Sequence, residues 1–167
     1  MMRLRPAAQS DASDIRTVHL LAFPTAAEAD LVEQLVRDGD AAISIVALED
    51  RRIVGHVLFS RMDVDADGRS VNALGLAPVA VLPDSIGQGI GSALIEAGIA
   101  EAARIGADVI FVLGDTDFYG RFGFKAEAAL PFVSPYAGAH FQALLLNQSL
   151  GSVVTGRARC ARAFAEL

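Results

Sequence analysis

The chain of 167 residues contains one cysteine, no tryptophan and a single lysine among its fourteen cationic residues. Because Cys160 is alone, it cannot form an internal disulfide, and a hydrophobic core has to stabilise the fold. No uninterrupted apolar run approaches the ~20 residues that span a bilayer. The first residues also lack the apolar segment of a secretory signal. We therefore expect a cytoplasmic protein that makes no use of a membrane.

Basic residues are outnumbered, and the formal net charge is −6. General nucleic-acid binders present a basic face, so we expect no nucleic-acid partner. An acidic chain can still bind a phosphate-bearing ligand, because the backbone N–H groups of a helix N-terminus need no side-chain charge. The length and the 53% apolar content predict one domain, residues 1–167, with a core of its own.

The N-terminal quarter has the spacing of a short strand followed by two helices. Ser10 and Asp11 are candidate N-caps of the first helix. The sequence T-A-A-E from Thr25 to Glu28 is typical of a capping box that opens the second helix.

The rest of the chain alternates β-prone runs with one long helical segment. The predicted elements are strands at 43–48, 52–59 and 72–82, a helix at 89–105, strands at 109–113 and 141–146, and a short edge strand at 153–155. The first two strands form a hairpin, and a short helix follows the strand at 109–113. This order indicates an α/β fold of the α+β type with a mixed sheet, and excludes a regular doubly wound fold.

Three alternating glycines, Gly87, Gly89 and Gly91, lie between a strand and the long helix. Glycine lets the backbone pass close to a ligand and adopt positive φ where needed. The first turn of a helix leaves N–H groups unpaired, and the helix dipole favours an anion there by about 1 kcal/mol. The spacing predicts a pyrophosphate site. A glycine-rich connector without a ligand is the alternative.

Two other phosphate-binding loop motifs do not match this sequence. The dinucleotide fingerprint G-x-G-x-x-G/A would need Gly or Ala at position 92 or 94, where this chain has Ser92 and Leu94. A P-loop needs the sequence G-K-S/T, which the chain lacks. A nucleotide-binding oxidoreductase is therefore disfavoured.

Residues 86–91, with the sequence I-G-Q-G-I-G, resemble the acetyl-CoA signature Q/R-x-x-G-x-G/A of the GNAT superfamily of N-acyltransferases. Residues 52–57 (R-I-V-G-H-V) resemble the hairpin strand of that family, and residues 118–124 (F-Y-G-R-F-G-F) resemble its F-Y-x-x-x-G-F motif. The three motifs occur in the family's order and cover most of residues 4–146. Singly, only the first would be specific.

The resemblance implies a sheet that is mixed and mostly antiparallel, flanked by helices, with strands splayed at the cofactor site. It also implies direct transfer of an acetyl group from acetyl-CoA to an amine of a small molecule or peptide, without a metal. A homodimer would follow the habit of the family. The backbone of the last strand residues would hold pantetheine and the thioester, and the glycine tract would hold the pyrophosphate. The residues concerned are Val79, Ala80, Val81, Gly87, Gln88, Gly89, Ile90, Gly91 and Ser92.

Two positions depart from the family pattern. Ile86 stands where the signature has Gln or Arg, so cofactor binding has to depend on backbone N–H groups. Val112 stands where many members carry an Asn that contacts the cofactor. The sequence V-L-G-D at residues 112–115 is similar to a subgroup of predicted N-acetyltransferases with poorly defined substrates.

Tyr119 occupies the position of the family's general acid, four residues before Gly123. A hydrogen bond from its hydroxyl would stabilise the leaving thiolate; packing alone is the alternative. Glu28 is the candidate base, because it heads the apolar stripe of the second helix. The alternative is that the capping box with Thr25 explains Glu28 locally.

Other polar residues have a structural interpretation that is at least as strong. His19 and His56 lie on apolar faces and are expected in the core. Asp115 follows a strand end, where it either serves the site or caps the next turn. A non-catalytic acyl-CoA-binding or regulatory module on the same fold would keep the glycine tract without needing Tyr119. The sequence does not identify the amine that accepts the acetyl group.

Overall fold

The computed structural model describes residues 1–166, and these residues form two compact units. The first unit contains Met1–Ser60, Ala77–Glu101 and the described residues from Arg162 onward; the second contains Arg61–Leu76 and Ala102–Ala161. This division does not test the prediction of one domain over residues 1–167, which stays a prediction.

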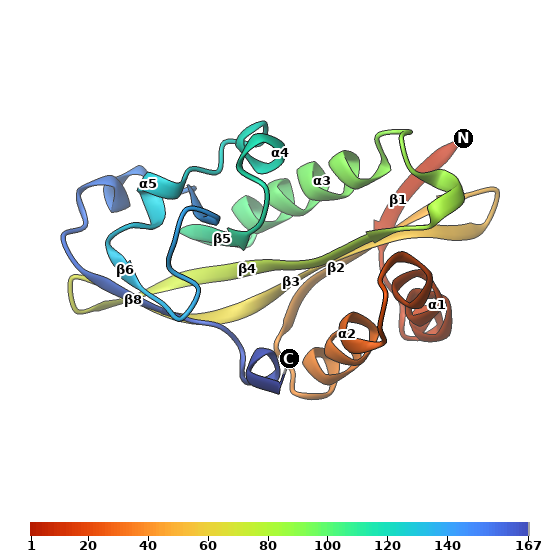
Figure 1. The fold of residues 1–167 in the computed structure, drawn as a ribbon, viewed down its shortest axis with the longest axis horizontal. Coiled ribbons are helices and arrows are strands. Elements are labelled where there is room, and N and C mark those ends of the chain that lie inside the picture. The colour runs from red at the N-terminus through yellow and green to blue at the C-terminus, as the bar shows by residue number, and fades with distance from the viewer. Residues whose placement is uncertain (167) are drawn as a thin grey trace. The chain divides into compact units, whose positions relative to one another are not determined.

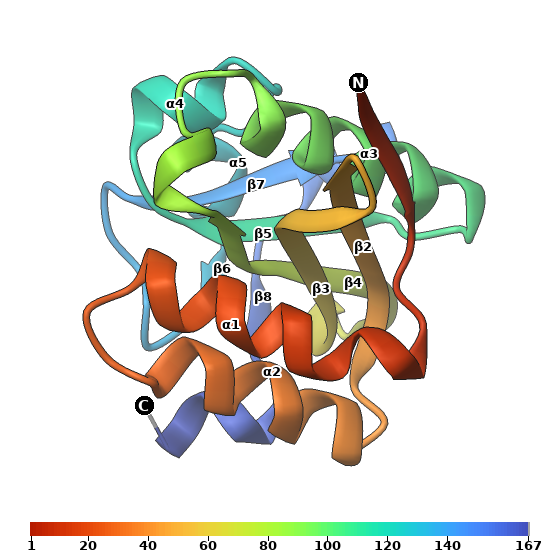
Figure 2. The same ribbon diagram turned by 90° about the vertical axis from the view of Figure 1, so that its right-hand side faces the viewer.

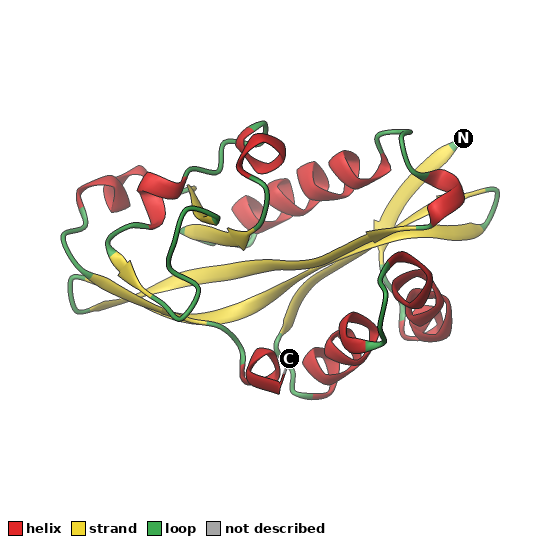
Figure 3. Ribbon diagram, in the orientation of Figure 1, coloured by secondary structure: helices red, strands yellow, loops and turns green. Residues whose placement is uncertain are grey.

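Figure 1 labels the larger elements along the chain, and Figure 3 separates helices from strands by colour. The strands are β1 (Met2–Pro6), β2 (Ala41–Glu49), β3 (Arg52–Ala66), β4 (Arg69–Val81), β5 (Val109–Leu113), β6 (Phe132–Val133), β7 (Phe141–Leu145) and β8 (Gly156–Arg159). The α-helices are α1 (Ala12–Ala22), α2 (Ala27–Arg37), α3 (Ile90–Arg104), α4 (Thr116–Gly120) and α5 (Ala126–Ala129). Short 3₁₀ turns occupy Gln9–Asp11, Pro83–Ser85, Gln148–Ser152 and Arg162–Glu166.

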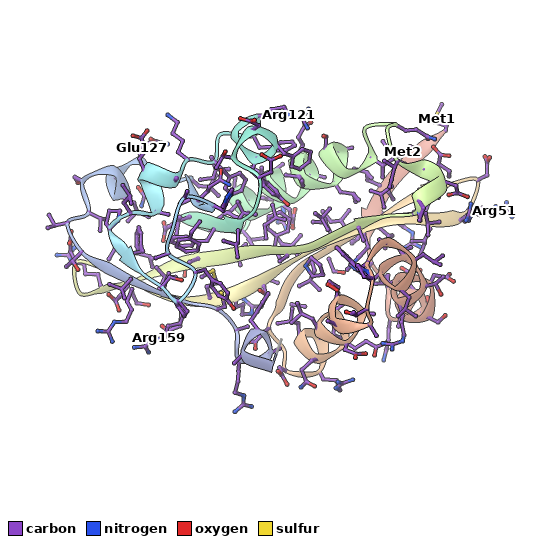
Figure 4. All side chains as sticks on the ribbon, in the orientation of Figure 1. Met1, Met2, Arg51, Arg121, Glu127 and Arg159 are labelled. Atoms are coloured by element: carbon purple, nitrogen blue, oxygen red, sulfur yellow. The ribbon has the colours of Figure 1, made fainter. Side chains whose placement is uncertain are left out.

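In the first unit, β1 pairs antiparallel with β2, and β2 pairs antiparallel with β3. The predicted hairpin between β2 and β3 is confirmed. Asp50 and Arg51 form its turn with φ of 49° and 70°, a conformation that short polar side chains tolerate better than most. Arg51 projects from the tip of this hairpin (Figure 4). The segment after β4 stays beside β3, because Leu82 N donates to Val54 O at 2.8 Å.

Helices α1 and α2 lie side by side (Figure 2). Arg16 on α1 joins them through ion pairs of 2.9 Å to Asp30 and 3.0 Å to Glu33. The predicted capping box is wrong. Helix α2 has its N-cap one residue later, at Ala26, and Thr25 Oγ1 instead accepts a weak hydrogen bond of 3.3 Å from Ala27 N.

Helix α3 packs against β3 at two glycines. A Cβ on Gly55 would lie 3.0 Å from Ile90 Cγ2 and 3.0 Å from Leu94 Cδ1. A Cβ on Gly98 would overlap the ring of Phe59, which is fully buried. Both positions therefore need glycine so that the helix can approach the strand closely. This packing fixes the N-terminus of α3, where the glycine tract ends.

The second unit contains an aromatic core. Phe111 stacks on Phe141 at 5.3 Å between ring centroids and meets Phe132 edge-on at 5.2 Å. Each of these rings buries enough apolar surface to stabilise the fold by about 1.5–3 kcal/mol. Phe111, Phe132 and Phe141 are therefore core residues.

Pairing in the second unit is parallel between β4 and β5, antiparallel between β5 and β7 and between β3 and β8, and parallel between β6 and β8. Together with the antiparallel pairs of the first unit, this confirms an α/β fold with a mixed, mostly antiparallel sheet flanked by helices. The predicted edge strand at 153–155 is wrong: those residues form a loop, and β8 begins at Gly156.

Candidate functional site

The glycine tract has the backbone conformation that the sequence predicted. Gly87 and Gly89 adopt φ of 85° and 79°, and a Cβ built on either of them would have no heavy atom within 4 Å. These two glycines are therefore required by conformation, since the space beside them is open. Gly91 has an ordinary φ and lies inside α3, where a Cβ would make only a 3.8 Å contact with Val81 Cγ2.

The first turn of α3 leaves donors available. Its first hydrogen bond joins Ala93 N to Gly89 O at 3.0 Å. The N–H groups of Ile90, Gly91 and Ser92 precede this bond and have no partner within the helix. Ile90 anchors the turn with a side chain that is 2% exposed, whereas Gln88 is exposed. The tract therefore presents a fixed row of donors at the positive end of a helix of 15 residues.

Val79, Ala80 and Val81 form the end of β4 and belong to the same unit as the tract. In the second unit, the parallel pairing of β4 with β5 ends at Gly75 and Phe111. The three predicted residues continue β4 beyond that pairing. Ala80 is buried, whereas Val79 and Val81 are half-buried.

Tyr119 lies on α4 in the second unit, within a cluster of aromatic rings. Its ring meets Phe118 edge-on at 5.0 Å and Phe124 edge-on at 5.9 Å. Burial raises the pKa of the Tyr119 hydroxyl above its ordinary value of 10. The hydroxyl is therefore a neutral hydrogen-bond donor at physiological pH.

Arg121 follows α4 and extends over neighbouring rings (labelled in Figure 4). Its guanidinium carbon lies 4.8 Å from the centroid of Phe118 and 5.7 Å from that of Phe122. Asp115 is the N-cap of α4, since its side chain accepts from Asp117 N at 2.9 Å. The capping interpretation of Asp115 is therefore confirmed.

Glu28 lies in the first turn of α2, in the first unit, and its side chain is half-buried. Its Oε1 atom is buried without a hydrogen-bond partner among the residues that the structure describes. Because the capping box is absent, a local structural role does not explain this carboxylate. A buried acceptor left unpaired costs about 1–3 kcal/mol, which favours a functional contact.

The two predicted core histidines are both fully buried, which confirms that interpretation. The sequence did not reveal that they contact each other. His19 Nε2 lies 2.8 Å from His56 Nδ1, and His56 Nε2 lies 2.8 Å from Ser44 Oγ. Burial lowers the pKa of His19 to about 4 and that of His56 to about 3, the latter with a contribution from His19. Both rings are neutral at pH 7, as a buried pair without a carboxylate requires.

Among the side chains that the structure describes, no three from histidine, cysteine, aspartate or glutamate are grouped so that they could hold a metal ion. The same residues include no helix with the length and hydropathy needed to cross a bilayer.

Comparison with known proteins shows a match of residues 3–126 to the model of the acetyltransferase (GNAT) domain. Among curated proteins, the chain is 38% identical to the uncharacterized N-acetyltransferase YjhQ of Escherichia coli K12 over 161 residues, covering 92% of this chain and 88% of YjhQ.

Two crystal structures are similar over nearly the whole chain. The GNAT family N-acetyltransferase YhbS of Escherichia coli, in complex with CoA, has a TM-score of 0.88 at 31% identity, covering 98% of this chain and 92% of YhbS. A GNAT family acetyltransferase of Brucella melitensis, in complex with acetyl-CoA, has a TM-score of 0.80 at 33% identity, covering 98% of each chain.

Proposed function

The chain belongs to the GNAT family of N-acetyltransferases, and from this premise we propose how its own residues carry out acetyl transfer from acetyl-CoA to an amine. The observation that carries the proposal is the pair Gly87 and Gly89, which adopt positive φ beside open space just before α3. The residues present fit a pyrophosphate, because their N–H groups are available without any side-chain cation.

We assign pyrophosphate binding to the backbone of residues 87–92 and the positioning of pantetheine to the backbone of Val79, Ala80 and Val81. Bound acetyl-CoA supplies an acetyl group activated as a thioester. An N–H group at the end of β4 would donate to the thioester oxygen and stabilise the charge that develops on it. No side chain is needed at position 86, which is consistent with the exposed Ile86.

The Tyr119 hydroxyl is the proposed proton donor to the leaving sulfur. Complete transfer from a phenol of pKa 10 to a thiolate of pKa about 8.5 is uphill by about 2 kcal/mol, and the raised pKa of Tyr119 makes it more so. A hydrogen bond that stabilises the developing thiolate is the more economical role. Such a bond to a charged group contributes about 1.5–3 kcal/mol.

Glu28 is the proposed acceptor of the proton that the amine loses. Deprotonating an alkyl ammonium of pKa about 10.4 at pH 7 costs roughly 4–5 kcal/mol. A carboxylate with an unpaired oxygen can hold the ammonium group and take its proton at Oε1, directly or through water. We further propose that the acceptor is a small molecule or a peptide, and that the protein acts in the cytoplasm as a homodimer.

The test combines cofactor binding with turnover on a panel of amines. Wild type should bind acetyl-CoA and release CoA in the presence of at least one amine. Tyr119→Phe should lower kcat roughly 10- to 100-fold with little change in acetyl-CoA affinity, as loss of one hydrogen bond to a developing charge requires. Glu28→Gln keeps the volume but cannot take a proton, so it should lower kcat with little change in acetyl-CoA affinity.

An unchanged kcat in Tyr119→Phe would refute its role as donor. Binding of acetyl-CoA without turnover on any amine would favour the second candidate, a non-catalytic acyl-CoA-binding or regulatory module on the same fold. The half-buried carboxylate of Glu28, whose Oε1 has no hydrogen-bond partner in the described part of the chain, favours the enzyme.

A further inference from the structure

The ring of Tyr119 lies directly against the backbone of Gly114. A Cβ on Gly114 would lie 2.5 Å from Tyr119 Cε2 and 3.1 Å from Tyr119 Cδ2. Gly114 does not adopt a positive φ, so backbone conformation does not account for glycine at this position. The close approach of the aromatic ring does.

The backbone of Gly114 is held in place from β7. Gly114 N donates to His140 O at 3.0 Å. Gly114 O accepts from Gln142 Nε2 at 3.0 Å and faces His140 Nδ1 at 3.3 Å. Gln142 is 1% exposed, so water cannot readily replace Gly114 O as the partner of its amide. A side chain added at Gly114 would therefore displace the ring sooner than the backbone.

Two other aromatic rings also contact the half-buried Tyr119 ring. Phe118 and Phe124 meet it edge-on, and Phe124 is 2% exposed. Tyr119 N donates to Asp115 O at 3.0 Å, which fixes the start of the Tyr119 side chain to the N-cap of α4. These contacts restrict the ring, and the backbone of Gly114 limits its position on one side.

We propose that Gly114 and Gln142 are positioning residues for Tyr119: the bare Cα of Gly114, tethered by the amide of Gln142, is the seat that sets where the Tyr119 hydroxyl lies. This inference rests on the proposed role of Tyr119 as hydrogen-bond donor to the leaving sulfur. Hydrogen bonds weaken steeply as their distance and angle depart from the optimum. A shift of the ring would therefore weaken the hydrogen bond from the Tyr119 hydroxyl to the leaving sulfur, although the hydroxyl itself is still present.

The seat can be tested without knowing the acceptor. The chain has no tryptophan and two tyrosines, so in a Tyr136→Phe background Tyr119 is the only source of tyrosine signal. Its near-ultraviolet circular dichroism reports how rigidly the ring is held, and spectroscopic titration reports its pKa. Gly114→Ala should weaken the tyrosine band and change the pKa. Gly151→Ala is the matched control, because a Cβ there has no heavy atom within 4 Å.

Turnover on an amine accepted by the wild type then tests the consequence. Gly114→Ala should lower kcat roughly 10- to 100-fold, as Tyr119→Phe does, with KM for acetyl-CoA within about twofold. In Tyr119→Phe the hydroxyl is already gone, so adding Gly114→Ala should lower kcat little further. A purely structural role of Gly114 would give additive losses.

The outcomes separate the two proposals. If Tyr119→Phe has no effect on kcat while Gly114→Ala alters the tyrosine spectrum, Tyr119 is not the hydrogen-bond donor, but Gly114 still positions its ring. If Tyr119→Phe lowers kcat while Gly114→Ala changes neither spectrum nor kcat, the seat is refuted. If Gly114→Ala fails to fold, Gln142→Leu can be used instead, because it removes the hydrogen bond to Gly114 O. It should weaken the near-ultraviolet tyrosine band in the same way but by a smaller amount. An unchanged tyrosine spectrum in Gln142→Leu would overturn the proposal.

Discussion

Acid should destabilise this protein through its buried histidine pair. His19 and His56 are fully buried and lie 2.8 Å apart between ring nitrogens. Among the residues that the structure describes, no carboxylate contributes to the pKa shift of either ring. Burial lowers the pKa of His19 from 6.5 to about 4 and that of His56 from 6.5 to about 3. In the unfolded chain both return to about 6.5.

The lowered pKa values of the folded state set the direction of the pH dependence. Between pH 6.5 and pH 4 the unfolded state binds more protons than the folded state, so stability falls as the pH falls. At pH 5 each ring is largely protonated when unfolded and largely neutral when folded. Each then lowers the free energy of unfolding by about 2 kcal/mol relative to pH 7, and the pair lowers it by about 3 to 4 kcal/mol. This is a large share of the 5–15 kcal/mol that stabilises a typical domain.

Urea unfolding, followed by far-ultraviolet circular dichroism at several pH values between 4.5 and 8 and constant ionic strength, measures this slope. The double variant His19→Gln/His56→Gln cannot titrate and should lose most of the pH dependence in that range. His140→Gln makes the same chemical change at an exposed position and is the matched control. A double variant with the slope of the wild type would refute this account of the pair.

Two further changes test the packing of the first unit. Asp11→Asn should destabilise the fold by about 1–2 kcal/mol at pH 7, because it removes the paired contacts of 2.7 and 3.0 Å with Arg5 and weakens the bond from Ala8 N; equal urea midpoints would contradict this. Gly98→Ala should cost about 1–3 kcal/mol through overlap with Phe59, and Phe59→Leu should relieve part of that cost in the double variant. Thermal unfolding checks both, and strict additivity would exclude the steric explanation.

Local signals predicted the elements of the first unit and the glycine tract. The hairpin turn, the two buried helical stripes and the start of α3 near Gly89 depend on neighbours within a few residues. Glycines at 87 and 89 proved to need positive φ, which the alternating pattern implied. The motif predicts Tyr119 as a site residue, which stays a prediction, and the structure adds that burial raises the pKa of its hydroxyl.

Features that depend on contacts between residues far apart in the sequence could not be predicted from the sequence alone. β8 contains two exposed arginines and pairs with Asp63–Ala66 of β3, 90 to 96 positions earlier in the chain. Nothing local therefore marks it as a strand. The hydrogen bond between His19 and His56 joins residues 37 positions apart; each could be predicted as buried, but their contact could not. The same holds for the seat of Tyr119, since Gln142 lies on a strand that only the fold brings to Gly114.

The central claim is that backbone N–H groups of the glycine tract bind the cofactor, and the affinity for CoA of two matched variants tests it most directly. Gly89 and Gly39 have nearly equal φ of 79° and 76°, and a Cβ on either would meet no heavy atom within 4 Å. Gly89→Asp and Gly39→Asp therefore impose similar strain, which Asp tolerates, but only the first adds a negative charge to the tract. Isothermal titration should show at least a 100-fold loss of CoA affinity in Gly89→Asp and a change within twofold in Gly39→Asp. Equal affinities in the two variants would contradict the claim.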